Sequence, residues 1–154
     1  MKNLLLMLFA TILATPALAS EVSKFLGRYE GVGGKCSGQR IYVSLGHSVW
    51  SKKIPAITFK AYDANARYGE ILLGEGQRQA PGTNPDIQGV VTEEWKTIVT
   101  DTALISSSTI SRPSVNLVYN EQSSMVIQNG IVEFRFESNA PGAAVSTLCL
   151  MKRY

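Results

Sequence analysis

The side chains with the clearest chemistry in this sequence are its two cysteines, Cys36 and Cys149. Two cysteines in an exported chain favour a disulfide, because the bond persists in oxidising compartments. With one histidine and no clustered cysteines, the sequence does not predict a metal site at these thiols. We therefore predict a Cys36–Cys149 disulfide, which would stabilise the fold by at most about 4 to 5 kcal/mol through the long loop that it closes.

Catalytic residue patterns are absent from the sequence. His47 lies in a predicted loop, 46–55, and a general base needs a nucleophile and an orienting partner that the sequence does not place beside it. The adjacent pair Glu93 and Glu94 would point to opposite faces of a strand. No phosphate loop, metal-ligand spacing or nucleophile turn is found, although a carboxylate pair assembled from distant strands stays possible. We predict a non-enzyme that uses no metal or cofactor.

Aromatic side chains are the remaining candidates for contact with a ligand. The predicted ligand-binding residues are Tyr29, Tyr42, Trp50, Phe59, Trp95 and Phe134. Tyr29, Phe59 and Phe134 would line an interior cavity of a few hundred Å³ in a carrier of a small apolar or amphipathic molecule. Alternatively, the interior is solid, and Trp50 or Trp95 anchors a protein partner in an interaction or inhibitor module that acts through its loops.

The first 19 residues have the pattern of a signal peptide. Lys2 gives a positive start, residues 4–12 are apolar, and Ala17-Leu18-Ala19 forms a cleavage site. A membrane-spanning helix is less consistent with this segment, because Pro16 interrupts an apolar run that would need about 20 residues. The chain is therefore predicted to be exported, either to a periplasm or out of the cell.

The rest of the chain, residues 20–154, is predicted to form one domain. No later segment is long and apolar enough to form a membrane span. The formal net charge of the whole chain is +3, and the charges are scattered, so nucleic acid is not predicted as a partner.

Alternation of apolar and polar residues predicts antiparallel β-strands in the C-terminal third. Val132, Phe134 and Phe136 alternate with charged residues, as in a half-buried strand. Asn129-Gly130, just before them, suits a type I′ turn. Residues 114–151 are predicted to contain four strands, with one polar turn at 120–123.

Further strands are predicted at 24–32, 39–45, 56–62 and 68–73, and a long loop at 74–88. Residues 92–99 are ambiguous: Thr92 could cap a short helix, but the β-branched residues favour two strands turning near Asp101, with a bend at 106–108. The total is eight or nine strands. Because a disulfide needs Cα atoms about 4.4–6.8 Å apart, the first and last strands must be close. We predict an all-β, antiparallel up-and-down meander, closed or nearly closed into a small barrel.

The segment Phe25-Leu26-Gly27-Arg28-Tyr29-Glu30-Gly31 resembles the opening of lipocalin-type (calycin-like) barrels, in which a Gly-x-Trp motif begins the first strand. Tyr29 stands where that family has Trp. The resemblance implies that a basic residue near the chain end, Lys152 or Arg153, packs over this aromatic ring. It also implies a small apolar ligand in the interior or, as in some relatives, inhibition of a protease.

Overall fold

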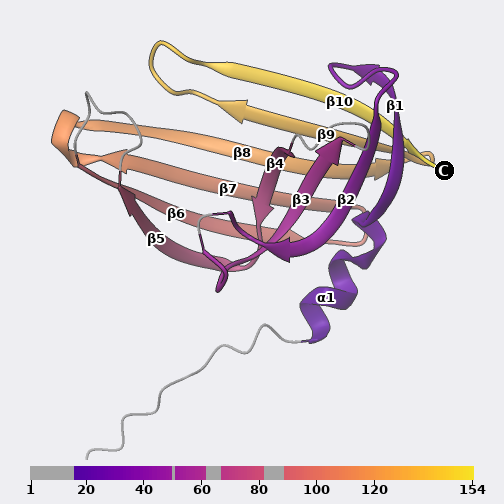
Figure 1. Cartoon of the computed structure of the whole chain (residues 1–154), viewed down its shortest axis with the longest axis horizontal. Coiled ribbons are helices and arrows are strands. Elements are labelled where there is room, and N and C mark those ends of the chain that lie inside the picture. Colours follow the sequence, from indigo (N-terminus) through magenta and orange to yellow (C-terminus); the bar gives the residue numbers. More distant parts are fainter. Residues whose placement is uncertain (1–15, 50, 62–66, 82–88) are drawn as a thin grey trace, which may run out of the picture.

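The computed structural model describes residues 16–49, 51–61, 67–81 and 89–154, and in these ranges it consists almost entirely of one antiparallel sheet (Figure 1). Its ten strands are β1 (Gly27–Gly34), β2 (Arg40–His47), β3 (Pro55–Ala61), β4 (Arg67–Leu72), β5 (Glu75–Pro81), β6 (Val90–Val99), β7 (Ala103–Arg112), β8 (Leu117–Gln128), β9 (Ile131–Ser138) and β10 (Val145–Arg153). A helix, α1 (Pro16–Val22), and two 3₁₀ turns, η1 (Ser23–Phe25) and η2 (Pro113–Val115), complete it. The predicted all-β meander is confirmed, with ten strands rather than eight or nine.

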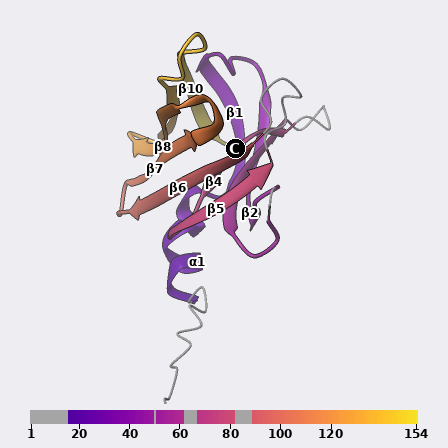
Figure 2. The same cartoon turned by 90° about the vertical axis from the view of Figure 1, so that its left-hand side faces the viewer.

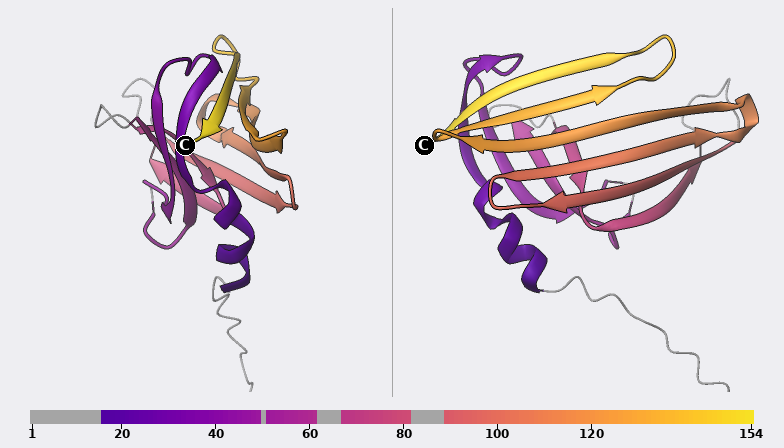
Figure 3. Two further views of the ribbon diagram at one scale, coloured as in Figure 1. Left: turned by 90° about the vertical axis from the view of Figure 1, so that its right-hand side faces the viewer. Right: turned by 180° about the vertical axis from the view of Figure 1, so that it is seen from behind.

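The first and last strands pair in the middle of the sheet. The order of strands is β4-β3-β2-β1-β10-β9-β8-β7-β6-β5, so β4 and β5 are the edges. The predicted closure into a barrel is not found, because no hydrogen-bonded ladder joins β4 to β5 in the described ranges. Instead the sheet bends, and β1–β4 cross the long strands β6–β10 at a steep angle (Figures 1 and 2). The view from behind shows the same two groups of strands facing each other (Figure 3).

The β1–β10 pairing is reinforced by the Cys36–Cys149 disulfide, whose Cα atoms lie 5.3 Å apart. Cys36 is in the turn after β1, and this turn approaches β10 closely. A Cβ atom on Gly31 would overlap the Cys36 carbonyl oxygen, and one on Gly34 (φ +71°) would overlap the Leu148 carbonyl oxygen. Glycine is therefore needed at both positions so that the turn can reach its bonded partner.

Three polar segments that had been predicted as turns or loops lie in strands. Residues 120–123 fall within β8, residues 106–108 within β7, and β5 occupies much of the predicted 74–88 loop. Residues 92–99 belong to β6, so the strand interpretation is the right one. The turn at Asn129-Gly130 is confirmed, with φ values of 52° and 76°.

The main apolar core lies at one end of the bent sheet, between β1–β4 and the ends of the long strands. Fully buried Val22 and Phe25, from α1 and η1, cover this end. The helix spans the predicted cleavage site after Ala19, but both core residues follow that site. Cleavage at that site would therefore not remove Val22 or Phe25 from the core.

Candidate functional site

An apolar pocket of about 280 Å³ lies beside the disulfide. We call it the disulfide pocket. Its lining residues are Lys35, Cys36, Gln39, Ile41, Phe59, Phe134, Thr147, Cys149 and Met151. They come from the turn after β1 and from strands β2, β3, β9 and β10, which the β1–β10 pairing brings together.

Two of the predicted ligand-binding residues meet in this pocket. The rings of Phe59 and Phe134 have centroids 4.5 Å apart and are tilted by 39°. Phe59 is 3% exposed and belongs to the core, whereas Phe134 is half-buried, opposite Cys149 in the β9–β10 register. Both rings therefore present apolar surface to the pocket, which is what a small apolar molecule would contact.

The Tyr29 side chain is fully buried, and its contacts support the fold. Its hydroxyl donates to the Phe25 carbonyl oxygen at 2.9 Å, and the Arg153 guanidinium lies 5.6 Å from its ring centroid. Of the two basic residues considered for this position, Arg153 is the one that lies over the ring, and its guanidinium also donates to the carbonyl oxygens of Lys24, at 3.0 Å, and Leu26. Burial raises the pKa of the Tyr29 phenol, and the Arg153 charge only partly offsets this. Tyr29 is not among the residues that line the disulfide pocket.

The remaining predicted aromatic residues do not meet in the pocket. Tyr42 is 43% exposed, so its side chain is not an interior contact. Trp95, proposed as an exposed anchor, is only 8% exposed; it packs with Ala56 and Leu72 and donates from Nε1 to the Leu73 carbonyl oxygen at 3.3 Å. Trp50 lies outside the described residues.

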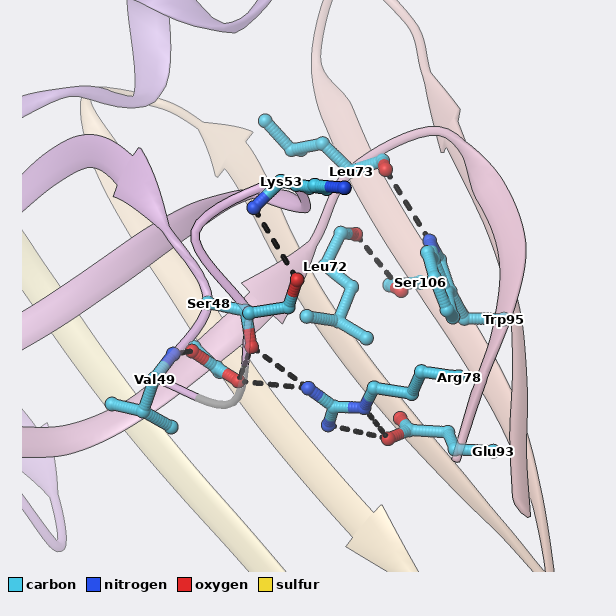
Figure 4. Close-up of polar contacts among 11 residues, drawn as sticks. Ser48, Val49, Lys53, Leu72, Leu73, Arg78, Glu93, Trp95 and Ser106 are labelled. Atoms are coloured by element: carbon cyan, nitrogen blue, oxygen red, sulfur yellow. Dashed lines mark hydrogen bonds and ion pairs between the residues drawn. The ribbon is translucent and has the colours of Figure 1, made fainter. Parts of the chain in front are cut away.

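Side chains of β6 and β7 bind the end of the edge strand β4, next to the start of β5, at a boundary that we call the seam. The Leu72 carbonyl oxygen, at the end of β4, accepts from the Thr97 hydroxyl. It also lies 3.2 Å from the Ser106 hydroxyl (Figure 4). The Thr97 amide donates to the Gly74 carbonyl oxygen at 2.7 Å. Polar groups on β6 and β7 thus satisfy carbonyls that a closed barrel would pair with a neighbouring strand.

An ion cluster extends the seam. Arg78 on β5 pairs with Glu93 on β6, and its Nη1 lies 3.5 Å from an oxygen of Glu70 on β4. Arg78 also donates to the Ser48 hydroxyl at 2.7 Å, and Ser48 donates to Glu70 at 2.8 Å (Figure 4). The side chains of Arg78, Glu93 and Glu70 are 16%, 15% and 13% exposed. The cluster therefore joins both sheet edges in a largely desolvated place, where ion pairs are screened little by solvent.

The ion cluster also lines a second, polar cavity of about 160 Å³. It is lined by Glu70, Arg78, Glu93 and Glu121, with serine hydroxyls and Phe136. Burial raises the pKa of the Glu121 carboxyl; the hydrogen bond from Ser138, at 3.2 Å, opposes this shift, and the nearby Glu93 charge adds to it. With three carboxylates around one arginine, this cavity repels anions. Glu121 was not predicted as a site residue because it lies within the predicted turn at 120–123.

Comparison with known proteins establishes no family for this chain. No protein-family model matches it. No curated protein matches it either. Among solved structures, it is similar to the crystal structure of secretory abundant heat soluble protein 4 from Ramazzottius varieornatus, with a TM-score of 0.45 and 14% identity, over 84% of this chain and 94% of that chain. In the described ranges, every helix falls short of the length and apolar character that a membrane crossing requires.

Replacing Arg78 should destabilise the fold. We expect Arg78→Met to lower the free energy of unfolding by about 2 to 3 kcal/mol, because Glu70 and Glu93 would then remain largely buried without their cation. The matched control is Arg135→Met: Arg135 also contacts two glutamates, Glu133 and Glu137, but is 45% exposed, so its loss should cost less than about 1 kcal/mol. Urea unfolding gives the free energy of unfolding of both variants, and equal decreases in the two would contradict the role of the ion cluster.

The raised pKa of Glu121 predicts a pH-dependent effect of its neutralisation. Its carboxyl favours the folded state below the ordinary glutamate pKa of 4.5, and this contribution is lost as the pH rises through the higher folded-state pKa. Glu121→Gln should therefore stabilise the protein at neutral pH, and the gain should shrink as the pH falls toward 4. Thermal melts across pH test this against Glu137→Gln, whose side chain is 52% exposed. A gain that grows on acidification would contradict the assignment.

Proposed function

We propose that this protein is an exported carrier that holds one small apolar or amphipathic molecule in the disulfide pocket. The observation that supports this most is the pocket itself: about 280 Å³, with a wall formed by Phe59, Phe134 and the disulfide. Ligand pockets for drug-sized molecules span about 300–1,000 Å³, so the expected ligand is smaller than a typical drug.

Covalent and hydrogen-bonded restraints on the pocket walls favour binding. The disulfide joins the turn after β1 to β10, and the Lys35 amide donates to the Leu148 carbonyl oxygen at 2.9 Å. A wall that is already ordered loses little conformational entropy when a ligand enters. Apolar ligand surface removed from water then contributes about 25 cal/mol per Å².

The proposed export is supported by the leader-like residues 1–19 and by the disulfide, since such bonds persist in oxidising compartments. The position of Arg153 over Tyr29 agrees with the contact implied by the resemblance to lipocalin-type barrels, whose interior also holds small apolar molecules. The alternative, an interaction module anchored by tryptophan, has less support, because Trp95 is buried at the seam.

Filling the pocket should weaken binding. The probe is N-phenyl-1-naphthylamine, a neutral aromatic molecule that fluoresces in apolar surroundings. Thr147→Phe places a ring in the pocket from its rim, and we expect at least about a tenfold loss of affinity, or 1.4 kcal/mol. The matched control is Ser146→Phe on the opposite, exposed face of β10, which should bind as the unaltered protein does.

Fluorescence titration gives the affinities, and thermal melts establish that both variants are folded. Equal affinities in the two variants would contradict the proposal, as would the absence of saturable binding to the unaltered protein.

A further inference from the structure

We infer that the natural occupant of the disulfide pocket is a small amphipathic anion. Its apolar body would lie against the contacting rings of Phe59 and Phe134, and a single carboxylate, sulfonate or phosphate headgroup would lie at Lys35. This inference rests on the proposed function and specifies the ligand class for the same pocket.

The chemistry of the pocket lining supports an anionic headgroup. Phe59, Phe134 and their apolar neighbours form most of the wall, while the polar side chains are Lys35, Gln39 and Thr147. All three can donate a hydrogen bond, and none carries a negative charge. A ligand with an apolar body and a headgroup that accepts hydrogen bonds matches this division. A cationic ligand would be repelled by Lys35, and no carboxylate lines the pocket to offset that repulsion.

The second cavity has the opposite electrostatic character. It places Glu70, Glu93 and Glu121 around a single cation, Arg78, which already pairs with two of them. An anion would be repelled there and would find no unpaired cation. The two cavities thus differ in sign, and of the two the disulfide pocket is the one suited to an anion.

Lys35 is held by its backbone while its ammonium group stays available. Its amide donates to the Leu148 carbonyl oxygen, and the next residue, Cys36, is bonded to Cys149. The side chain is exposed, and none of the ion pairs found among the described residues involves it. Lys24 and Lys96, in contrast, lie 3.5 and 3.6 Å from carboxylates.

The position at the rim also limits the cost of desolvation. A charge buried in the apolar interior would lose its hydration, at a cost of several kcal/mol. At Lys35 the headgroup keeps part of its water while the apolar body is buried. Ion pairs in such partly exposed places are weak, and they become stronger where the site is drier, so we expect an effect on affinity of about 3- to 10-fold.

A pair of probes isolates the headgroup. 1-Anilinonaphthalene-8-sulfonate and N-phenyl-1-naphthylamine share one aromatic body and differ in the sulfonate. Lys35→Gln should weaken binding of the sulfonate about 3- to 10-fold and leave the neutral probe unchanged. The matched control is Lys60→Gln, which removes the same charge from an exposed residue of β3 that does not line the pocket. It should change neither affinity.

Salt provides a second readout. Sulfonate affinity of the unaltered protein should fall as NaCl is added, and this dependence should be reduced in Lys35→Gln. Equal sulfonate affinities in Lys35→Gln and Lys60→Gln would overturn the inference. If the neutral probe still depends on Thr147→Phe in that case, the proposed carrier function stands and only the anionic headgroup is wrong. If neither probe responds to Thr147→Phe, the carrier function itself fails.

Discussion

The covalent bond between Cys36 and Cys149 is the constraint on which the rest of the structure depends. It fixes the first strand beside the last one, so β1 and β10 lie in the middle of the sheet and the free edges are β4 and β5. A sheet bent in this way exposes two rows of unpaired backbone groups. Side chains bind some of these groups: Thr97, Ser106 and Trp95 donate hydrogen bonds to the carbonyl oxygens at the end of β4. Arg78 joins both edges through its ion pairs with Glu70 and Glu93.

The same constraint divides the interior into two parts. Near the disulfide, β1–β3 cover the ends of β9 and β10, and the side chains there are mostly apolar. Toward the seam, the second cavity is lined by serine and glutamate side chains together with Arg78, and some of these are the polar partners of the open edges. The polar part stabilises the bend but raises the pKa of Glu121, whereas the apolar part leaves a pocket. Stability at the seam and the proposed binding beside the disulfide therefore depend on separate sets of residues.

Local patterns predicted the elements whose faces differ in polarity. The alternation in β9 and the Asn129-Gly130 turn are visible in the sequence, and the proximity of the first and last strands follows from pairing the cysteines. The strands β5 and β8 were missed or divided because both of their faces are polar near the seam, so Glu121 and its neighbours look like a turn. Period-two alternation cannot identify a strand when the inner face also carries charge.

The candidate site was predictable only in part, for a related reason. Alternation assigns Phe59 and Phe134 to one face each, but their meeting depends on how the sheet bends. Trp95 seemed an exposed anchor because the seam that buries it joins residues from β3, β4 and β6. Arg78 lay in a predicted loop, and no local pattern pairs it with Glu70 and Glu93. Lys35 has no distinguishing sequence feature beyond its position beside Cys36.

An experimental structure of the oxidised protein with N-phenyl-1-naphthylamine bound tests the central claim most directly. We expect the naphthyl ring to lie against the rings of Phe59 and Phe134, in contact with the disulfide, while the seam stays intact. A pocket filled by its own side chains, with the probe on the outer surface or in the polar cavity, would contradict it.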